Sequence, residues 1–221
     1  MSSSHGPGCT RRRSVAETAE DARRGSLGGM STTGSCTWTT GRLAARPPVP
    51  ADALAVLALH SDPEAVAHNP GDRLSDLRQA EDLLQRWVRH WQEHHIGYWL
   101  LTGHDDEHVV GVCGVKRMTL LDRPVWNLLY RLEPSVRGRG LATEAATAAV
   151  TRARRHPSGL PVVARVRPAN HASARVALAA GLQRSPWLDT AGEDGPDDLY
   201  LVPPGREPSA PSSGGGDRLT A

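Results

Sequence analysis

Blocks of hydrophobic and polar residues alternate along residues 41–203 and predict both helices and strands. Apolar side chains recur at helical spacing in four segments, each with a residue that starts or stops a helix beside it. The predicted helices cover residues 50–62, 75–95, 141–155 and 170–181. Glycines at 140 and 181 mark the start of the third helix and the end of the fourth.

The segment 75–95 is the clearest of these helices. Ser75 is the predicted N-cap, and Gly97 is the residue expected to stop the helix. The predicted buried face consists of Leu77, Leu84, Val88 and Trp91. A long amphipathic helix of this kind is expected to cover one face of a sheet.

Strands are predicted from short runs of apolar and β-branched residues bounded by turn residues. They cover residues 41–47, 98–103, 108–118, 125–134, 162–167 and 199–202. The polar turn at 104–107 makes the second and third strands a hairpin, and Pro134 ends the fourth. Because the helices do not alternate strictly with the strands, the fold class predicted is α+β with one mixed, mostly antiparallel sheet.

The two ends of the chain lack this patterning. Residues 1–40 are rich in Ser, Gly, Thr and Arg, and residues 204–221 in Pro, Ser and Gly, so both are expected to be disordered. One folded domain is therefore expected over residues 41–203. Met30 is a candidate for the true initiation site, which would leave residues 1–29 untranslated.

Composition narrows the class of protein. The net charge of +2 is too small to indicate bulk nucleic-acid binding, and no apolar run is long enough to span a membrane. The cysteines at 9, 36 and 113 are odd in number and form no pair, which favours a reducing compartment. The start lacks the apolar stretch of a signal peptide, so a cytoplasmic protein is expected, as a monomer or homodimer.

The stretch VRGRGLATEA at 136–145 carries the main candidate chemistry. Glycines stand between a predicted strand and a predicted helix, where backbone N–H groups point at an anion. No Ser, Asp or Asn is available to cap this helix, so its first N–H groups are free for an external phosphate. Neither the dinucleotide fingerprint nor the P-loop pattern fits these residues. A simple turn before a helix remains the alternative.

A family resemblance covers residues 41–203. Arg137-Gly138-Arg139-Gly140-Leu141-Ala142 resembles the (Q/R)-x-x-G-x-(G/A) signature of the GCN5-related N-acetyltransferases (GNAT), and the segment 167–182 resembles their N-x-x-S motif and the Gly-hydrophobic pair after it. The start of the domain is most similar to the branch that contains ribosomal-protein N-terminal acetyltransferases. The resemblance implies a GNAT-type sheet and an acetyl-coenzyme A-dependent N-acetyltransferase.

The resemblance also implies roles for particular residues. The backbone amides of the glycine loop would hold the pyrophosphate of acetyl-coenzyme A, and Asn170 would contact the pantetheine arm. The loop residues concerned are Arg137, Gly138, Arg139, Gly140, Leu141, Ala142 and Thr143. The backbone N–H of Leu132 would bind the thioester carbonyl, where a fixed donor stabilises the oxyanion formed on attack.

Two proton-handling roles remain. Many members of the family place a Tyr where this chain has Ala177, so the resemblance points to Ser173 as the donor to the leaving thiolate. A Ser in the first turn of a helix can also simply bond the backbone. The candidate bases are the carboxylates Glu133, Asp189 and Glu193, whereas dipole stabilisation explains Glu144 equally well.

Other features of the sequence allow other functions. His90, Glu93 and His94 match an inverted zinc motif, but the helix that carries them is needed for core packing, so no metal is expected. The same fold could serve as a non-catalytic acyl-coenzyme A sensor, and the arginines could serve a nucleic-acid-associated structural domain. The expected partner is an amine, either a protein N-terminus or a small molecule, with no nucleic acid or membrane.

Overall fold

The computed structural model describes residues 36–188, 190–192 and 195–202. Its strands pair in the order β1-β2-β3-β4-β5-β6-β9-β7, with β8 paired to β9. The strands are β1 (Trp38–Thr39), β2 (Ala44–Arg46), β3 (Tyr98–Thr102), β4 (Val109–Leu120), β5 (Arg123–Leu132), β6 (Val162–Val166), β7 (Gln183–Arg184), β8 (Thr190–Gly192) and β9 (Gly195–Val202). Among the strands of the described residues, β5 and β6 form the one parallel pair and the other pairs are antiparallel, so the predicted mixed α+β fold is confirmed.

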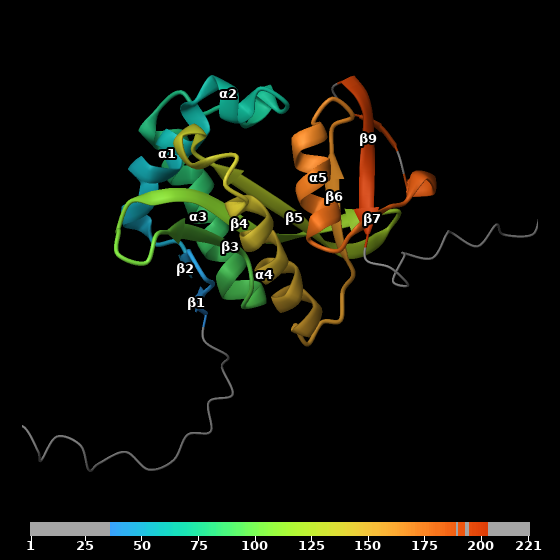
Figure 1. Cartoon of the computed structure of the whole chain (residues 1–221), viewed down its shortest axis with the longest axis horizontal. Helices are drawn as coiled ribbons and strands as arrows, with labels where there is room; N and C mark the ends of the chain where they lie inside the picture. The colour runs from blue at the N-terminus through green and yellow to red at the C-terminus, as the bar shows by residue number, and fades with distance from the viewer. Residues whose placement is uncertain (1–35, 189, 193–194, 203–221) are drawn as a thin grey trace, which may run out of the picture. The chain divides into compact units, whose positions relative to one another are not determined.

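Helices cover both faces of this sheet (Figure 1). They are α1 (Ala53–Ser61), α2 (Pro63–Val66), α3 (Leu77–His94), α4 (Leu141–Arg155) and α5 (His171–Ala179), with short 3-10 turns η2 (Pro50–Asp52), η3 (Pro70–Asp72), η4 (Pro134–Val136) and η5 (Pro186–Leu188). On β3, Trp99 and Leu101 pack with α4, whereas Tyr98 and Leu100 pack with α1 and α3. Because successive side chains of a strand point to opposite faces, β3 contributes to the hydrophobic cluster on each face of the sheet.

The helix α3 differs in detail from the prediction. Its N-cap is Asp76, whose carboxylate accepts the N–H of Gln79 at 2.9 Å, and not Ser75. It ends at His94, and its C-cap His95 takes the left-handed conformation two residues before Gly97. Leu77 is 40% exposed and Val88 half-buried, and the buried face is formed by Ala80, Leu84, Trp87 and Trp91. Gly97 is needed for another reason, because a Cβ there would lie 2.6 Å from the Trp91 indole nitrogen.

The helix α4 has the predicted bounds. Its buried residues are Ala145, Ala146, Ala149, Val150 and Ala153. Alanine is the strongest helix former and its small side chain lets the helix axis approach the sheet closely. The sequence of α4 therefore supports both the helix and its close packing beneath the site.

The domain starts earlier than predicted. Trp38 and Thr39 pair with β2 as strand β1, within the segment 1–40 that was expected to be disordered. The Trp38 ring is buried against Trp99, and the guanidinium of Arg152 lies 5.6 Å from its centroid. A single aromatic anchor of this kind leaves no periodic signal in a sequence. Residues 1–35 and 203–221, including Met30, lie outside the described residues.

Candidate functional site

The site begins where β5 and β6 separate. These parallel strands pair only at Trp126–Val162 and Asn127–Val163, and further along β6 pairs with β9 while β5 continues beside β4 alone. The Asn127 side chain accepts the N–H of Arg165 at 3.3 Å, at the point of separation. In Figure 1, β6, β7, β9 and α5 accordingly form a group beyond β5.

The backbone of Leu132 faces this separation. Glu133 donates its N–H to the Val110 carbonyl on β4 at 3.0 Å. Because successive N–H groups along a strand point to opposite sides, the N–H of Leu132 points away from β4, to the side from which β6 has departed. Arg137 donates from Nε to the Leu132 carbonyl at 3.0 Å and holds this end of β5 in place.

The glycine loop follows directly and leads into α4. Gly138 and Gly140 have φ values of +74° and +76°, in the left-handed region that favours glycine. Gly140 is the N-cap of α4, and no side chain caps the helix. Within the described part of the chain, the N–H groups of residues 138–143 have no hydrogen-bond acceptor. A row of free amides at a helix N-terminus fits the pyrophosphate of a coenzyme A thioester.

Arg42, which precedes β2, anchors this loop to the first turn of α4. Its Nη1 donates to the Arg139 carbonyl at 2.7 Å, and its Nε donates to Glu144 at 2.7 Å. Thr40 also donates its hydroxyl to Glu144, so this carboxylate is fully used as a structural acceptor. The Glu144 pKa is lowered by the bonds from Thr40 and Arg42, which outweigh the opposing effect of burial. Sequence reasoning missed Arg42, because only the fold brings it near the loop.

The start of α5 brings two further predicted residues together. The Asn170 side-chain oxygen accepts the N–H of Ser173 at 3.0 Å and thus caps the helix. The Ser173 hydroxyl lies 2.9 Å from the hydroxyl of Tyr130 on β5. Burial raises the pKa of Tyr130 to about 12. Tyr130 was also missed, since a Tyr in the middle of a strand reads as ordinary packing.

Charged residues gather on the face of β5 that packs against α1. Arg131 is buried, donates to Asp72 of η3 at 2.7 Å and contacts the ring of His60 on α1. Burial and the neighbouring Arg131 charge lower the pKa of His60 to about 4, so this imidazole is neutral at pH 7. The cluster ties η3 and α1 to the residue that precedes Leu132.

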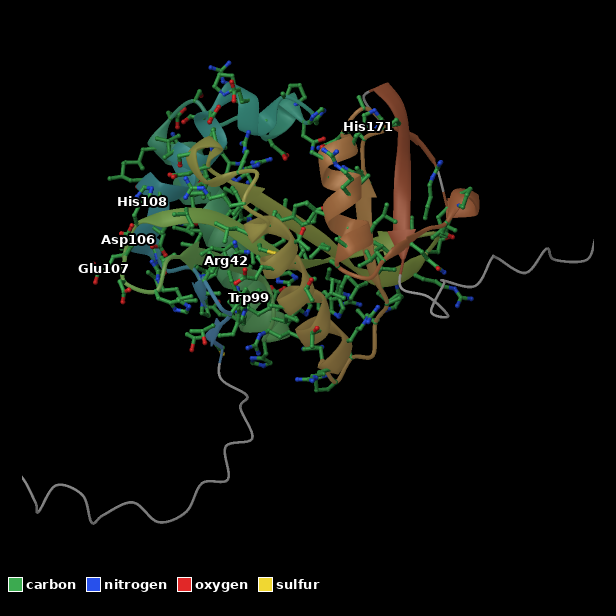
Figure 2. The ribbon with its side chains drawn as sticks, viewed as in Figure 1. Arg42, Trp99, Asp106, Glu107, His108 and His171 are labelled. Carbon is green, nitrogen blue, oxygen red and sulfur yellow. The ribbon has the colours of Figure 1, made fainter. Side chains whose placement is uncertain are left out.

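Glu133, a predicted base, is paired with a histidine. Its carboxylate oxygens lie 2.9 and 3.0 Å from Nε2 of His108, and that carboxylate raises the His108 pKa. His108 is exposed and stands beside Asp106 and Glu107 in the turn between β3 and β4 (Figure 2). The other predicted bases, Asp189 and Glu193, lie outside the described residues.

The histidine motif of α3 has a structural role. His90 accepts the N–H of Arg117 through Nε2 at 3.0 Å, and burial lowers its pKa to about 4. Its ring and that of His94 stand edge-on to Trp126. No group of three or more His, Cys, Asp or Glu within the described ranges is arranged to hold a metal ion. No helix in those ranges is long and apolar enough to cross a membrane.

Comparison with known proteins places this geometry in a family. The sequence model of the acetyltransferase (GNAT) domain matches residues 42–183, from Arg42 to the first residue of β7. This range contains the separated strands, the glycine loop and α5. No curated protein sequence matches the chain.

Solved structures agree with that match. A protein from Bordetella pertussis described as a GnaT-family acetyltransferase is similar with a TM-score of 0.65 and 23% identity, over 76% of this chain and 98% of that one. An acetyltransferase from Agrobacterium tumefaciens is similar with a TM-score of 0.63 and 26% identity, over 75% of this chain and 92% of that one. RimL, a ribosomal L7/L12 alpha-N-protein acetyltransferase in complex with coenzyme A, is similar with a TM-score of 0.63 and 16% identity, over 74% of this chain and 94% of that one.

The match of the family model covers more than half of the chain, and the fold and the glycine loop agree with it. Expectations of the acetyltransferase family and of the α+β fold are thereby confirmed. The chain belongs to the GNAT family of acetyltransferases.

Proposed function

We propose that the protein transfers the acetyl group of acetyl-coenzyme A to a primary amine, directly and in a ternary complex. The observation that carries this proposal is the row of unpaired N–H groups at residues 138–143, beside the outward N–H of Leu132. Acetyl-coenzyme A would supply a thioester that is already activated for acyl transfer. The protein then has to bind the pyrophosphate, orient the carbonyl and manage two protons.

The backbone performs the binding and polarising steps. The amides of residues 138–143 hold the pyrophosphate, and Asn170, whose side-chain nitrogen is not used in capping, binds the pantetheine arm. The N–H of Leu132 donates to the thioester oxygen, and this hydrogen bond strengthens as the oxygen becomes negative during attack. Arg137 keeps that N–H in position through its bond to the same residue's carbonyl.

Side chains handle the protons. The amine must be neutral to attack, so a base must accept its proton. We assign this role to Glu133, which follows Leu132 directly and is the one of the three candidate carboxylates that lies within the described residues. Ser173 donates a hydrogen bond to the departing sulfur. Glu133→Gln and Ser173→Ala are each expected to lower kcat about tenfold or more while the affinity for acetyl-coenzyme A is retained. Asp189→Asn tests the alternative base in the same assay.

The acceptor is a protein N-terminus or a small primary amine. Two carboxylates support a cationic acceptor on the α1 side of β5, namely Glu133 and the partly exposed Asp72. RimL is an alpha-N-protein acetyltransferase by its title, which makes peptide N-termini the first class to test. Acetylation would be followed by mass spectrometry with a peptide library and a panel of small amines.

The test has two stages. Calorimetric titration of the full chain with acetyl-coenzyme A is expected to show one site, and Gly140→Val is expected to abolish it. Release of free thiol in the presence of amines then reports turnover. Binding without turnover for any amine would favour a non-catalytic sensor of acyl-coenzyme A. The observation behind this alternative is Ala177, which stands where many members of the family have a Tyr. Absence of binding would contradict the proposed function.

A further inference from the structure

The hydroxyl of Tyr130 joins the two elements that flank the separation of β5 and β6. Its oxygen lies 2.7 Å from the carbonyl oxygen of Ser173 and 2.9 Å from the Ser173 hydroxyl. Tyr130 belongs to β5, two residues before Leu132 on the same face of the strand, and Ser173 belongs to the first turn of α5. Both side chains are half-buried. This contact therefore couples the backbone beside Leu132 to the proposed hydrogen-bond donor.

The donors and acceptors in this contact can be assigned by elimination. A carbonyl oxygen can only accept, so Tyr130 donates its single proton to the Ser173 carbonyl. The Ser173 hydroxyl must then donate its own proton to Tyr130. In this arrangement the Ser173 proton is already used and cannot serve a ligand. It is released only when the Tyr130 O–H turns from the carbonyl to the Ser173 oxygen.

We propose that Tyr130 is a positioning residue for Ser173: when its O–H turns to the Ser173 oxygen, it directs the Ser173 O–H toward the sulfur of acetyl-coenzyme A. This inference rests on the proposed function and adds a residue to its site. Rotation about the phenolic C–O bond is sufficient for the change. The resulting chain runs from Tyr130 to Ser173 to sulfur, and hydrogen bonds in such chains strengthen one another.

Relative acid strengths decide what this chain delivers. The pKa of Tyr130 is about 12, that of an ordinary thiol is about 8.5, and a serine hydroxyl is a weaker acid than either. Neither hydroxyl gives up its proton to a thiolate, so the chain stabilises the thiolate by a hydrogen bond alone. This differs from general acid catalysis, in which the donor loses a proton.

The proton balance of the transfer follows. The amine nitrogen forms a bond to the carbonyl carbon, the C–S bond breaks, and its electron pair stays on sulfur. The amine proton passes to Glu133 and then to water. The sulfur leaves as a thiolate that accepts the Ser173 hydrogen bond, and it takes a proton from water after transfer. Tyr130 and Ser173 are unchanged at the end of each cycle.

The pKa of the thiol of bound coenzyme A tests this arrangement without any acceptor. Thiolate absorbance of the full chain with coenzyme A is followed against pH, and the same complex with desulfo-coenzyme A is the blank that removes the protein's own groups. The wild-type complex is expected to lower the thiol pKa by about one unit, as for a hydrogen bond to a charged group. Ser173→Ala should lose most of this shift. Tyr130→Phe should also lose most of it, because the Ser173 hydroxyl then has no donor to orient it and can turn to a backbone carbonyl of its own helix instead of sulfur. The double variant should lose no more than either single variant.

A matched substitution controls for loss of a hydroxyl as such. Tyr98→Phe removes a tyrosine hydroxyl from β3 on the opposite face of the sheet, where Tyr98 stacks edge-on against Trp87, and is expected to keep the wild-type thiol pKa. Urea unfolding of each variant separates instability from the titration result, since Tyr130→Phe retains the ring. Turnover should parallel the titration. In Tyr130→Phe, kcat is expected to be about tenfold lower than in the wild type, with the KM for acetyl-coenzyme A within twofold. The double variant should show no further fall in kcat below the single variants.

The outcomes separate this inference from the proposed function. If coenzyme A binds and the thiol pKa is the same in wild type and Tyr130→Phe, the role of Tyr130 is refuted and the proposed function stands. The same holds if the two substitutions multiply in their effect on kcat. If the wild-type protein does not bind coenzyme A, both fail together.

Discussion

Arg42 holds Glu144 by two of its guanidinium nitrogens, with Nε at 2.7 Å and Nη2 at 2.6 Å from the same carboxylate oxygen. The residues are far apart in sequence, and their pairing ties the chain before β2 to the first turn of α4. The third nitrogen of Arg42 reaches the Arg139 carbonyl. One side chain thus fixes both the helix and the loop that precedes it.

Arg42→Ala is expected to loosen the glycine loop. The affinity for acetyl-coenzyme A should fall about fivefold, which corresponds to about 1 kcal/mol, because the amides of residues 138–143 lose part of their alignment. The free energy of unfolding should change by less, about 0.5 kcal/mol, since Arg42 is half exposed. Calorimetry and urea unfolding measure the two quantities. Equal affinity in the wild type and variant would show that the loop needs no anchor.

Glu144→Gln distinguishes a structural carboxylate from a catalytic one. Burial raises the Glu144 pKa, but the bonds from Thr40 and Arg42 outweigh this and lower it, so the carboxylate stays ionised to more acidic pH than an ordinary glutamate. We expect the pH profile of kcat to keep its shape in the variant, with only the affinity for acetyl-coenzyme A reduced. Loss of the acidic limb of the profile would instead identify Glu144 as the base.

Gly140→Val is expected to abolish binding of acetyl-coenzyme A, whereas Arg139→Ala should weaken it less than about fivefold. At a φ of +76° a branched side chain strains the backbone by about 1–3 kcal/mol and moves the amides of the loop. Gly159→Val is the matched control, because its φ is +62°, its Cβ meets open space, and it lies at the other end of α4. A larger loss in Arg139→Ala than in Gly140→Val would contradict the assignment of the loop.

The pairing of His108 with Glu133 predicts a pH dependence of turnover. Glu133 raises the pKa of His108, so the imidazolium persists above the usual 6.5 and occupies the carboxylate. With Glu133 as the base, kcat should rise with pH as His108 loses its proton and frees the carboxylate. His108→Gln should move this rising limb of the pH profile of kcat to lower pH. Titration of the His108 ring by NMR measures the pKa directly. An unchanged limb in His108→Gln would leave Asp189 and Glu193 as the candidates.

Stability should depend on His60 at acidic pH. Its pKa is about 4 in the folded protein and near 6.5 in the unfolded chain. Between these values the unfolded chain binds the extra proton, so the free energy of unfolding falls as the pH drops from 6.5 to 4. His60→Gln is expected to flatten this decline, with His90 contributing the remainder. Urea unfolding at several pH values measures it, and a decline equally steep in His60→Gln would contradict the assignment.

The limits of prediction are visible in α3. Its apolar period was sufficient to predict a helix, yet Leu77 is exposed and Asp76 replaces Ser75 as the cap. Periodicity reports which positions face the core only on average, because the rotation of a helix is set by what it packs against. Capping is decided by one hydrogen bond, here from Gln79 to Asp76, which depends on local backbone angles.

By itself, the sequence determined the fold class, the bounds of α4 and the glycine loop before it. These features depend on local propensity and short motifs, which act between neighbours in the chain. Only the tertiary structure decided which hydrogen-bond partners the charged groups and hydroxyls have. Arg42 meets Glu144, Tyr130 meets Ser173 and His108 meets Glu133 across separations of 25 residues or more. A side chain's hydrogen-bond partner is set by three-dimensional packing, and no local pattern encodes it.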